Sequence, residues 1–111
     1  MNDGRTDNFN AADVRRFNSM AHRWWETDGE MRMLHRMNPA RVDFVATAVG
    51  LDGARVLDVG CGAGILAEAL AGRATTVVGI DLATEALAVA RLHAVESGIQ
   101  NIDYRTTSVE A

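Results

Sequence analysis

Apolar residues recur along the chain at spacings that change from helical to strand-like and back. Between residues 13 and 25 they return every three or four positions, with arginine and asparagine on the other side. This period predicts an amphipathic helix, with Asp13 as its N-cap. Residues 1–12 are polar and without a period, so we expect a disordered N-terminus there. A polar stretch at 27–30 predicts a break after the helix.

A second helix is predicted to begin at Asn38 and Pro39. Asparagine caps a helix well, and proline suits the first helical position because its missing N–H is not needed there. The helix is expected to end at Gly50, and its apolar stripe consists of Val42, Val45, Ala46 and Val49.

The rest of the chain alternates between β-branched runs and helical stripes. The runs predict strands at 55–59, 75–80 and 102–106, the last of them half-exposed as at a sheet edge. Between them lie a helix that ends at Gly72 and another that is capped by Asp81 or Thr84 and closed by Gly98. The order is β-α-β-α-β after N-terminal helices, which predicts an α/β fold with a parallel sheet.

A glycine-rich loop follows the first predicted strand. Gly60, Gly62 and Gly64 suit a tight turn that a ligand can approach closely. Asp81 ends the next strand, at the same carboxyl edge of the sheet, where its carboxylate could accept hydrogen bonds from a ribose diol. The pattern indicates an adenosine-type site, while plainer interpretations remain open: a simple turn for the glycines and a helix cap for Asp81.

The kind of cofactor depends on two positions near this loop. A dinucleotide-binding loop needs a glycine at position 65, where the chain has Ile65. Asp58 would repel a pyrophosphate, whereas it would attract a ligand with an amino group and a sulfonium; it could also simply accept hydrogen bonds from loop N–H groups. The sequence therefore disfavours a nicotinamide dehydrogenase.

At these positions the chain resembles the class I S-adenosylmethionine-dependent methyltransferases. VLDVGCGAG (residues 56–64) is similar to their first motif, and VVGIDLA (residues 77–83) to the acidic end of their second strand. Further segments resemble the N-terminal region of the bacterial ubiquinone biosynthesis O-methyltransferases: RWW and LHRMNPAR near the N-terminus, then GILAEALA and ARLHAVESGI.

The resemblance implies the N-terminal half of a Rossmann-like methyltransferase fold. It divides the chain into the N-terminus, a helical region at 13–50 and the first half of the cofactor-binding domain at 51–111. Arg41 is implied to grip the methionine carboxylate of S-adenosyl-L-methionine, and Leu82 to pack on adenine unless it belongs to the core. The implied cofactor-binding residues are Arg41, Asp58, Gly60, Gly62, Gly64, Asp81 and Leu82.

The implied function is S-adenosylmethionine-dependent O-methylation of a phenol or catechol hydroxyl on a polyprenylated intermediate of ubiquinone biosynthesis. The 111 residues by themselves are expected to be inactive, and no catalytic residue is assigned. Two alternatives stay open: another class I small-molecule methyltransferase, and a non-catalytic remnant that binds S-adenosylmethionine.

The composition limits which binding partners and which cellular compartment we expect for this protein. A net charge of −4 disfavours nucleic acid as a partner, and the single cysteine, Cys61, excludes an internal disulfide. Histidines 22, 35 and 93 lack metal-ligand spacing, so no metal site is expected. Without an apolar run of about eighteen residues or a signal peptide, we expect a cytoplasmic protein. A polyprenylated substrate would add transient contact with the inner membrane, and the Trp24–Trp25 pair could serve there or in ordinary packing.

Overall fold

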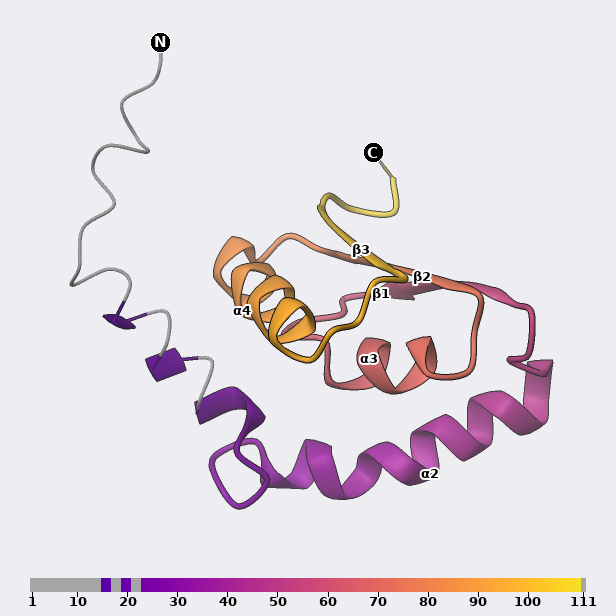
Figure 1. Cartoon of the computed structure of the whole chain (residues 1–111), viewed down its shortest axis with the longest axis horizontal. Coiled ribbons are helices and arrows are strands. Elements are labelled where there is room, and N and C mark those ends of the chain that lie inside the picture. Colours follow the sequence, from indigo (N-terminus) through magenta and orange to yellow (C-terminus); the bar gives the residue numbers. More distant parts are fainter. Residues whose placement is uncertain (1–14, 17–18, 21–22, 111) are drawn as a thin grey trace, which may run out of the picture.

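A three-stranded parallel sheet with helices against one face forms the body of the protein (Figure 1). The computed structural model describes residues 15–16, 19–20 and 23–110. The predictions for residues 1–12 and for Asp13 as a cap lie outside these described residues. The elements are α2 (Arg32–Val49), β1 (Arg55–Val59), α3 (Ile65–Ala71), β2 (Thr76–Asp81), α4 (Thr84–Glu96) and β3 (Ile102–Thr106).

The strands lie in the order β1-β2-β3, and each neighbouring pair is parallel. Val56 is in register with Val77, and Gly79 with Tyr104. The predicted strands are confirmed to within one residue, and β3 lies at an edge as expected. The parallel α/β arrangement brings the carboxyl ends of all three strands to one edge of the sheet.

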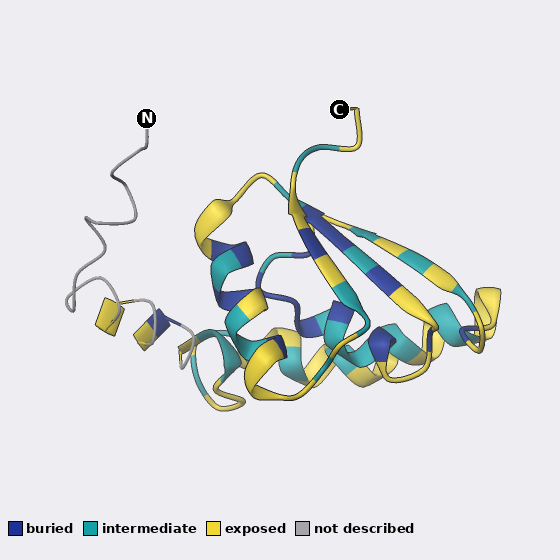
Figure 2. Cartoon of the chain, turned by 45° about the horizontal axis from the view of Figure 1, so that its top comes forward, coloured by how far each residue is buried: buried dark blue, intermediate teal, exposed yellow. Residues whose placement is uncertain are grey.

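The core lies between the sheet and the helices, which Figure 2 shows on one side of the strands. The most deeply buried large side chains are Leu51, Val77, Leu87 and Val89. α2 lies outside α3 and packs on the same core through Val42, Val45 and Ala46. On the other face of the sheet Leu57 and Val59 are 54% and 57% exposed, because no described segment covers them.

The predicted start of the second helix was wrong. α2 begins at Arg32, so Pro39 lies inside the helix and Val49, placed in the apolar stripe, is exposed. Asn38 does not cap a helix; its side-chain N–H donates to the carbonyl oxygen of Ile65, 3.1 Å away. The residues that precede Asn38 are good helix formers and extend the helix through the proline despite the lost hydrogen bond.

The other helix ends agree more closely with the sequence. Residues 27–31 form the predicted break, and Gly72 follows α3. α4 begins one residue after its cap, Ala83, so neither of the two predicted caps holds that position. Asp81 nevertheless stabilises this end of the helix, because its Oδ1 accepts the N–H of Ala83 at 2.9 Å.

Candidate functional site

The glycine loop turns sharply between β1 and α3. Gly60, Gly62 and Gly64 have φ angles of 72°, 57° and 88°, a region that other residues rarely adopt. The N–H groups of Gly60 and Cys61 both donate to the carbonyl oxygen of Ile80, at 2.8 and 3.1 Å. These bonds hold the loop against the end of β2. The positive φ therefore explains all three glycines, and at Gly64 the close approach of Tyr104 leaves no room for a side chain either.

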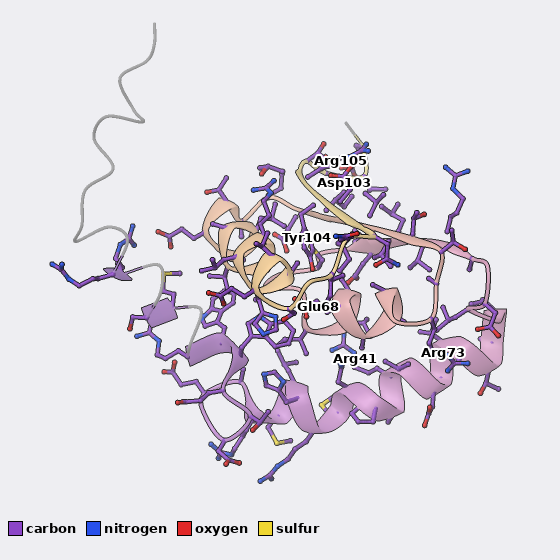
Figure 3. All side chains as sticks on the ribbon, viewed as in Figure 1. Arg41, Glu68, Arg73, Asp103, Tyr104 and Arg105 are labelled. Carbon is purple, nitrogen blue, oxygen red and sulfur yellow. The ribbon has the colours of Figure 1, made fainter. Side chains whose placement is uncertain are left out.

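A cavity of about 330 Å³ lies between this loop, α2 and the segment before α2. Arg41 and Asp58 bring opposite charges into it, and Figure 3 shows Arg41 extending from α2 toward the body of the domain. The remaining lining residues are apolar or glycine, except for Cys61: Trp24, Met31, Leu34, Gly60, Cys61, Gly62, Ala63, Ile65 and Leu66. We refer to this space as the first cavity.

Asp58 has a buried carboxylate oxygen, Oδ2, that lacks a hydrogen-bond partner among the described residues. Burial raises the pKa of this carboxyl above its usual value, while the positive charge of Arg41 lowers it and the negative charge of Asp81 raises it further. A buried acceptor without a donor is costly, so such an atom points to a ligand that supplies the missing donor. An ammonium group in the first cavity would satisfy it.

Asp81 is held in place by backbone N–H groups. Its Oδ2 accepts the N–H of Gly62 at 2.9 Å, and its Oδ1 accepts that of Ala83 at the same distance. The bonds from Ala83 and Gly62 lower the pKa of this carboxyl, which keeps it ionised. Each carboxylate oxygen can accept a second hydrogen bond, so Asp81 can serve the loop and a ligand diol together.

A second cavity, of about 270 Å³, opens on the other side of Gly60. Asp81 and Leu82 line it from the end of β2. Leu82 is 70% exposed, so its alternative placement in the core was wrong. The other lining residues are Val59, Gly60, Ile80, Thr107, Ser108, Val109 and Glu110.

The two cavities divide the predicted site residues. Arg41, Asp58 and Gly62 line the first, Asp81 and Leu82 line the second, and Gly60 borders both. Gly64 lines neither; a side chain there would collide with the hydroxyl group of Tyr104. That six of these seven residues meet around one loop supports a shared ligand.

The apolar wall of the first cavity, formed by Trp24, Met31 and Leu34, was not predictable as a unit from the sequence. Leu34 and Met31 lie about one and two turns before Asn38, on the side of the chain that also presents Arg41. Their spacing continues the helical period upstream of Pro39, a signal that the proline obscured. Cys61 also lines this cavity, but burial raises the pKa of its thiol to about 12, which leaves it protonated and a poor nucleophile.

The chain is similar to known methyltransferases. Residues 56–111 match the family model described as "Methyltransferase domain". The ubiquinone biosynthesis O-methyltransferases of Paracidovorax citrulli and Xanthomonas campestris pv. campestris are 52% and 51% identical over 96% and 95% of this chain. The chain spans 44% of the length of each of these curated relatives.

Solved structures share the fold. The YcgJ protein from Bacillus subtilis is 30% identical, with a TM-score of 0.60 over 69% of this chain and 32% of its own. The magnesium protoporphyrin IX methyltransferase from Synechocystis PCC 6803, solved with bound SAH, is 21% identical. Its TM-score is 0.65 over 92% of this chain and 49% of its own, which supports the Rossmann-like fold alone.

Proposed function

The chain belongs to the methyltransferase domain family, and from that premise we propose that it binds S-adenosyl-L-methionine across the glycine loop. The observation that carries this proposal is the buried Oδ2 of Asp58, which has no hydrogen-bond partner in the described part of the chain and lies in a cavity that also contains Arg41. The amino-acid end of the cofactor has one charged group for each of these two side chains. Its ammonium would donate to Asp58 and its carboxylate would accept from the guanidinium of Arg41.

The second cavity suits the other end of the same ligand. Asp81 would accept hydrogen bonds from the ribose hydroxyls, and the exposed Leu82 would pack on the adenine ring. Gly60 borders both cavities, so a ligand with methionine and adenosine ends would cross the loop at this residue. Any residue other than glycine would be strained at position 60, since φ is 72° there.

Within the complete protein we propose O-methylation of a phenol or catechol on a polyprenylated ubiquinone precursor. This rests on the names of relatives about 50% identical to this chain. The bound cofactor would supply an electrophilic methyl group to the acceptor oxygen. This chain's residues would orient the cofactor, Arg41 and Asp58 at its amino-acid end and Asp81 at its ribose. Such positioning of the methyl group lowers the barrier to its transfer.

The described residues around the first cavity offer no good acceptor for the phenol proton. Their ionisable side chains are Arg41, Asp58 and Cys61. An arginine stays protonated, the Cys61 thiol has a raised pKa, and Asp58 would face the ligand ammonium. We therefore assign these residues to binding and expect the 111-residue chain alone to give no turnover.

A transient contact with a membrane surface belongs to this proposal, because a polyprenylated substrate resides in lipid. Among the described helices none is both long and apolar enough to cross a bilayer. The alternative of a non-catalytic protein that binds S-adenosylmethionine shares the same two cavities. Transfer of labelled methyl to a demethylated ubiquinol analogue by the product of the complete gene would decide between them.

We expect the parent protein to bind S-adenosylhomocysteine more tightly than NAD. Replacing Asp81 tests the ribose contact. Asp81→Ala should weaken S-adenosylhomocysteine binding by roughly 1.5–3 kcal/mol, the range for hydrogen bonds to a charged group. Titration calorimetry on the product of the complete gene measures this. Asp103→Ala, which removes an exposed carboxylate from β3, is the matched control and should bind like the parent. Unchanged affinity in Asp81→Ala, or tighter binding of NAD by the parent, would refute the ribose assignment.

A further inference from the structure

Four segments of the chain meet at the indole of Trp25. This ring stacks on the imidazole of His93 in α4, with centroids 3.6 Å apart and 3° between the planes. The Nδ1 of His93 lies 2.7 Å from Oε2 of Glu68 in α3, and a carboxylate only accepts, so this nitrogen carries the hydrogen. Figure 3 shows Glu68 where α3 and α4 come together. The indole N–H of Trp25 donates to the carbonyl oxygen of Ala63, 3.2 Å away in the glycine loop.

Further contacts tie the start of α2 to the same place. The ring of His35 meets Trp25 edge to face at a centroid distance of 5.6 Å. Its Nε2 lies 3.0 Å from the carbonyl oxygen of Trp24. The indole of Trp25 therefore contacts the glycine loop, α2 and α4, and through His93 it is linked to α3.

We propose that Trp25, His93 and Glu68 are positioning residues for the amino-acid end of the cofactor. This inference rests on the proposed function, which identifies the ligand. The three residues, the Trp25–His93–Glu68 cluster, line neither cavity. Their immediate neighbours do: Trp24 precedes Trp25 in the chain, and Ala63, which accepts the bond from Trp25, lies in the loop.

The cluster would affect the ligand indirectly, by holding lining residues of the first cavity in place. Trp24 lies in the helical residues 23–25, and Met31 ends the turns at 27–31 that lead to α2; these turns have few regular hydrogen bonds of their own. The contacts of Trp25 with the glycine loop, α2 and α4 thus hold the adjacent Trp24 over the loop. The second cavity is built from β1, β2 and residues after β3, so it does not depend on the cluster.

This division predicts different effects on two ligands. S-adenosylhomocysteine would occupy both cavities, whereas adenosine has no amino-acid end and would use the second. His93→Leu removes the stacked ring and should weaken S-adenosylhomocysteine binding about three- to tenfold, the range for one aromatic pair. The affinity for adenosine should stay within about twofold. Glu68→Gln should give a smaller loss, because a neutral amide holds the imidazole less firmly than a carboxylate does.

The experiment is titration calorimetry with both ligands on the product of the complete gene and its variants. His93→Phe retains stacking on Trp25 without the ring nitrogen and should recover part of the affinity lost in His93→Leu. Glu96→Gln replaces an exposed glutamate of α4 and is the matched control for Glu68→Gln. Melting temperatures establish that each variant is folded, and Glu68→Gln keeps the test usable should His93→Leu fail to fold.

The outcomes separate the positioning role from the proposed function. Loss of S-adenosylhomocysteine affinity with adenosine unchanged supports the positioning role. Equal losses for both ligands would show a merely structural cluster, and no loss would show that the wall needs no support; each overturns the inference and leaves the proposed function standing. A parent protein that binds neither ligand overturns the proposed function and the inference with it.

Discussion

Asp58 lowers the stability of the folded chain in a position where it would serve ligand binding. Its carboxylate is buried beside one favourable charge, Arg41, and its Oδ2 has no donor among the described residues. Natural sites often keep such costly groups because a ligand uses them. Asp81 shows the opposite arrangement, since backbone N–H groups satisfy both of its oxygens.

Asp58→Asn should raise stability at neutral pH and weaken cofactor binding. Because burial raises the pKa of Asp58 in the folded chain, the folded state holds its proton more tightly than the unfolded state does. Stability is therefore lost as the pH rises from the usual aspartate range through the raised pKa, and the asparagine variant escapes this loss. Urea unfolding should show an advantage of the variant at pH 7 that shrinks as the pH falls toward 4. An advantage that grows toward acid pH would contradict the burial argument.

Arg41→Lys should also weaken S-adenosylhomocysteine binding, although the charge is kept. A lysine ammonium cannot form the planar pair of hydrogen bonds that a guanidinium makes with a carboxylate. An analogue without the carboxylate should then bind the parent and the variant equally in calorimetry. Arg73→Lys, at an exposed arginine after α3, is the control. A variant that still discriminates strongly against the analogue would show that another group recognises the carboxylate.

At the scale of the elements, the strands and the loop were predictable because their signals are local. Short apolar runs with an aspartate at or near their end define β1 and β2 by themselves. Asp58 in β1 and Gly60 in the loop after it follow directly from that assignment. α2 was not predictable in the same way, because the bond from Asn38 to Ile65 is tertiary and competes with the capping role that the sequence suggests.

Gly79 in the middle of β2 is a second position where a tertiary contact decides which residue fits. It faces Tyr104 across the β2–β3 pair, and a methyl group there would lie 2.8 Å from two ring carbons of Tyr104 and 2.9 Å from Sγ of Cys61. Gly79→Ala should therefore destabilise the fold by about 1–3 kcal/mol, the usual cost of overpacking a core. Urea unfolding measures the change.

Gly72→Ala is the matched control for that substitution. Gly72 has an ordinary helical φ of −66°, and its nearest neighbour would be the carbonyl oxygen of Ala69 at 3.5 Å. Alanine should leave the stability unchanged or raise it by up to about 1 kcal/mol. Equal losses in both variants would contradict the close approach of Tyr104 to β2.

At the scale of the whole molecule, the sheet is covered on one face and open on the other. The helices bury the inner side of β2 and β3, while Leu57 and Val59 are exposed on the outer side of β1 (Figure 2). β1 also ends the strand order, so its outer edge has no partner strand among the described residues. An apolar face beside an unpaired edge favours pairing with another chain.

The isolated 111-residue chain should therefore self-associate through β1. Sedimentation velocity at increasing concentration should show a shift from monomer to larger species. The double variant Leu57→Thr and Val59→Thr has β-branched residues suited to a strand at both positions but lacks much of the apolar surface, so it should remain monomeric to higher concentration. Val95→Thr replaces a comparably exposed valine of α4, away from the sheet, and should associate like the parent. A parent chain that stays monomeric throughout, or a double variant that associates as strongly, would show that the open face of β1 does not drive association.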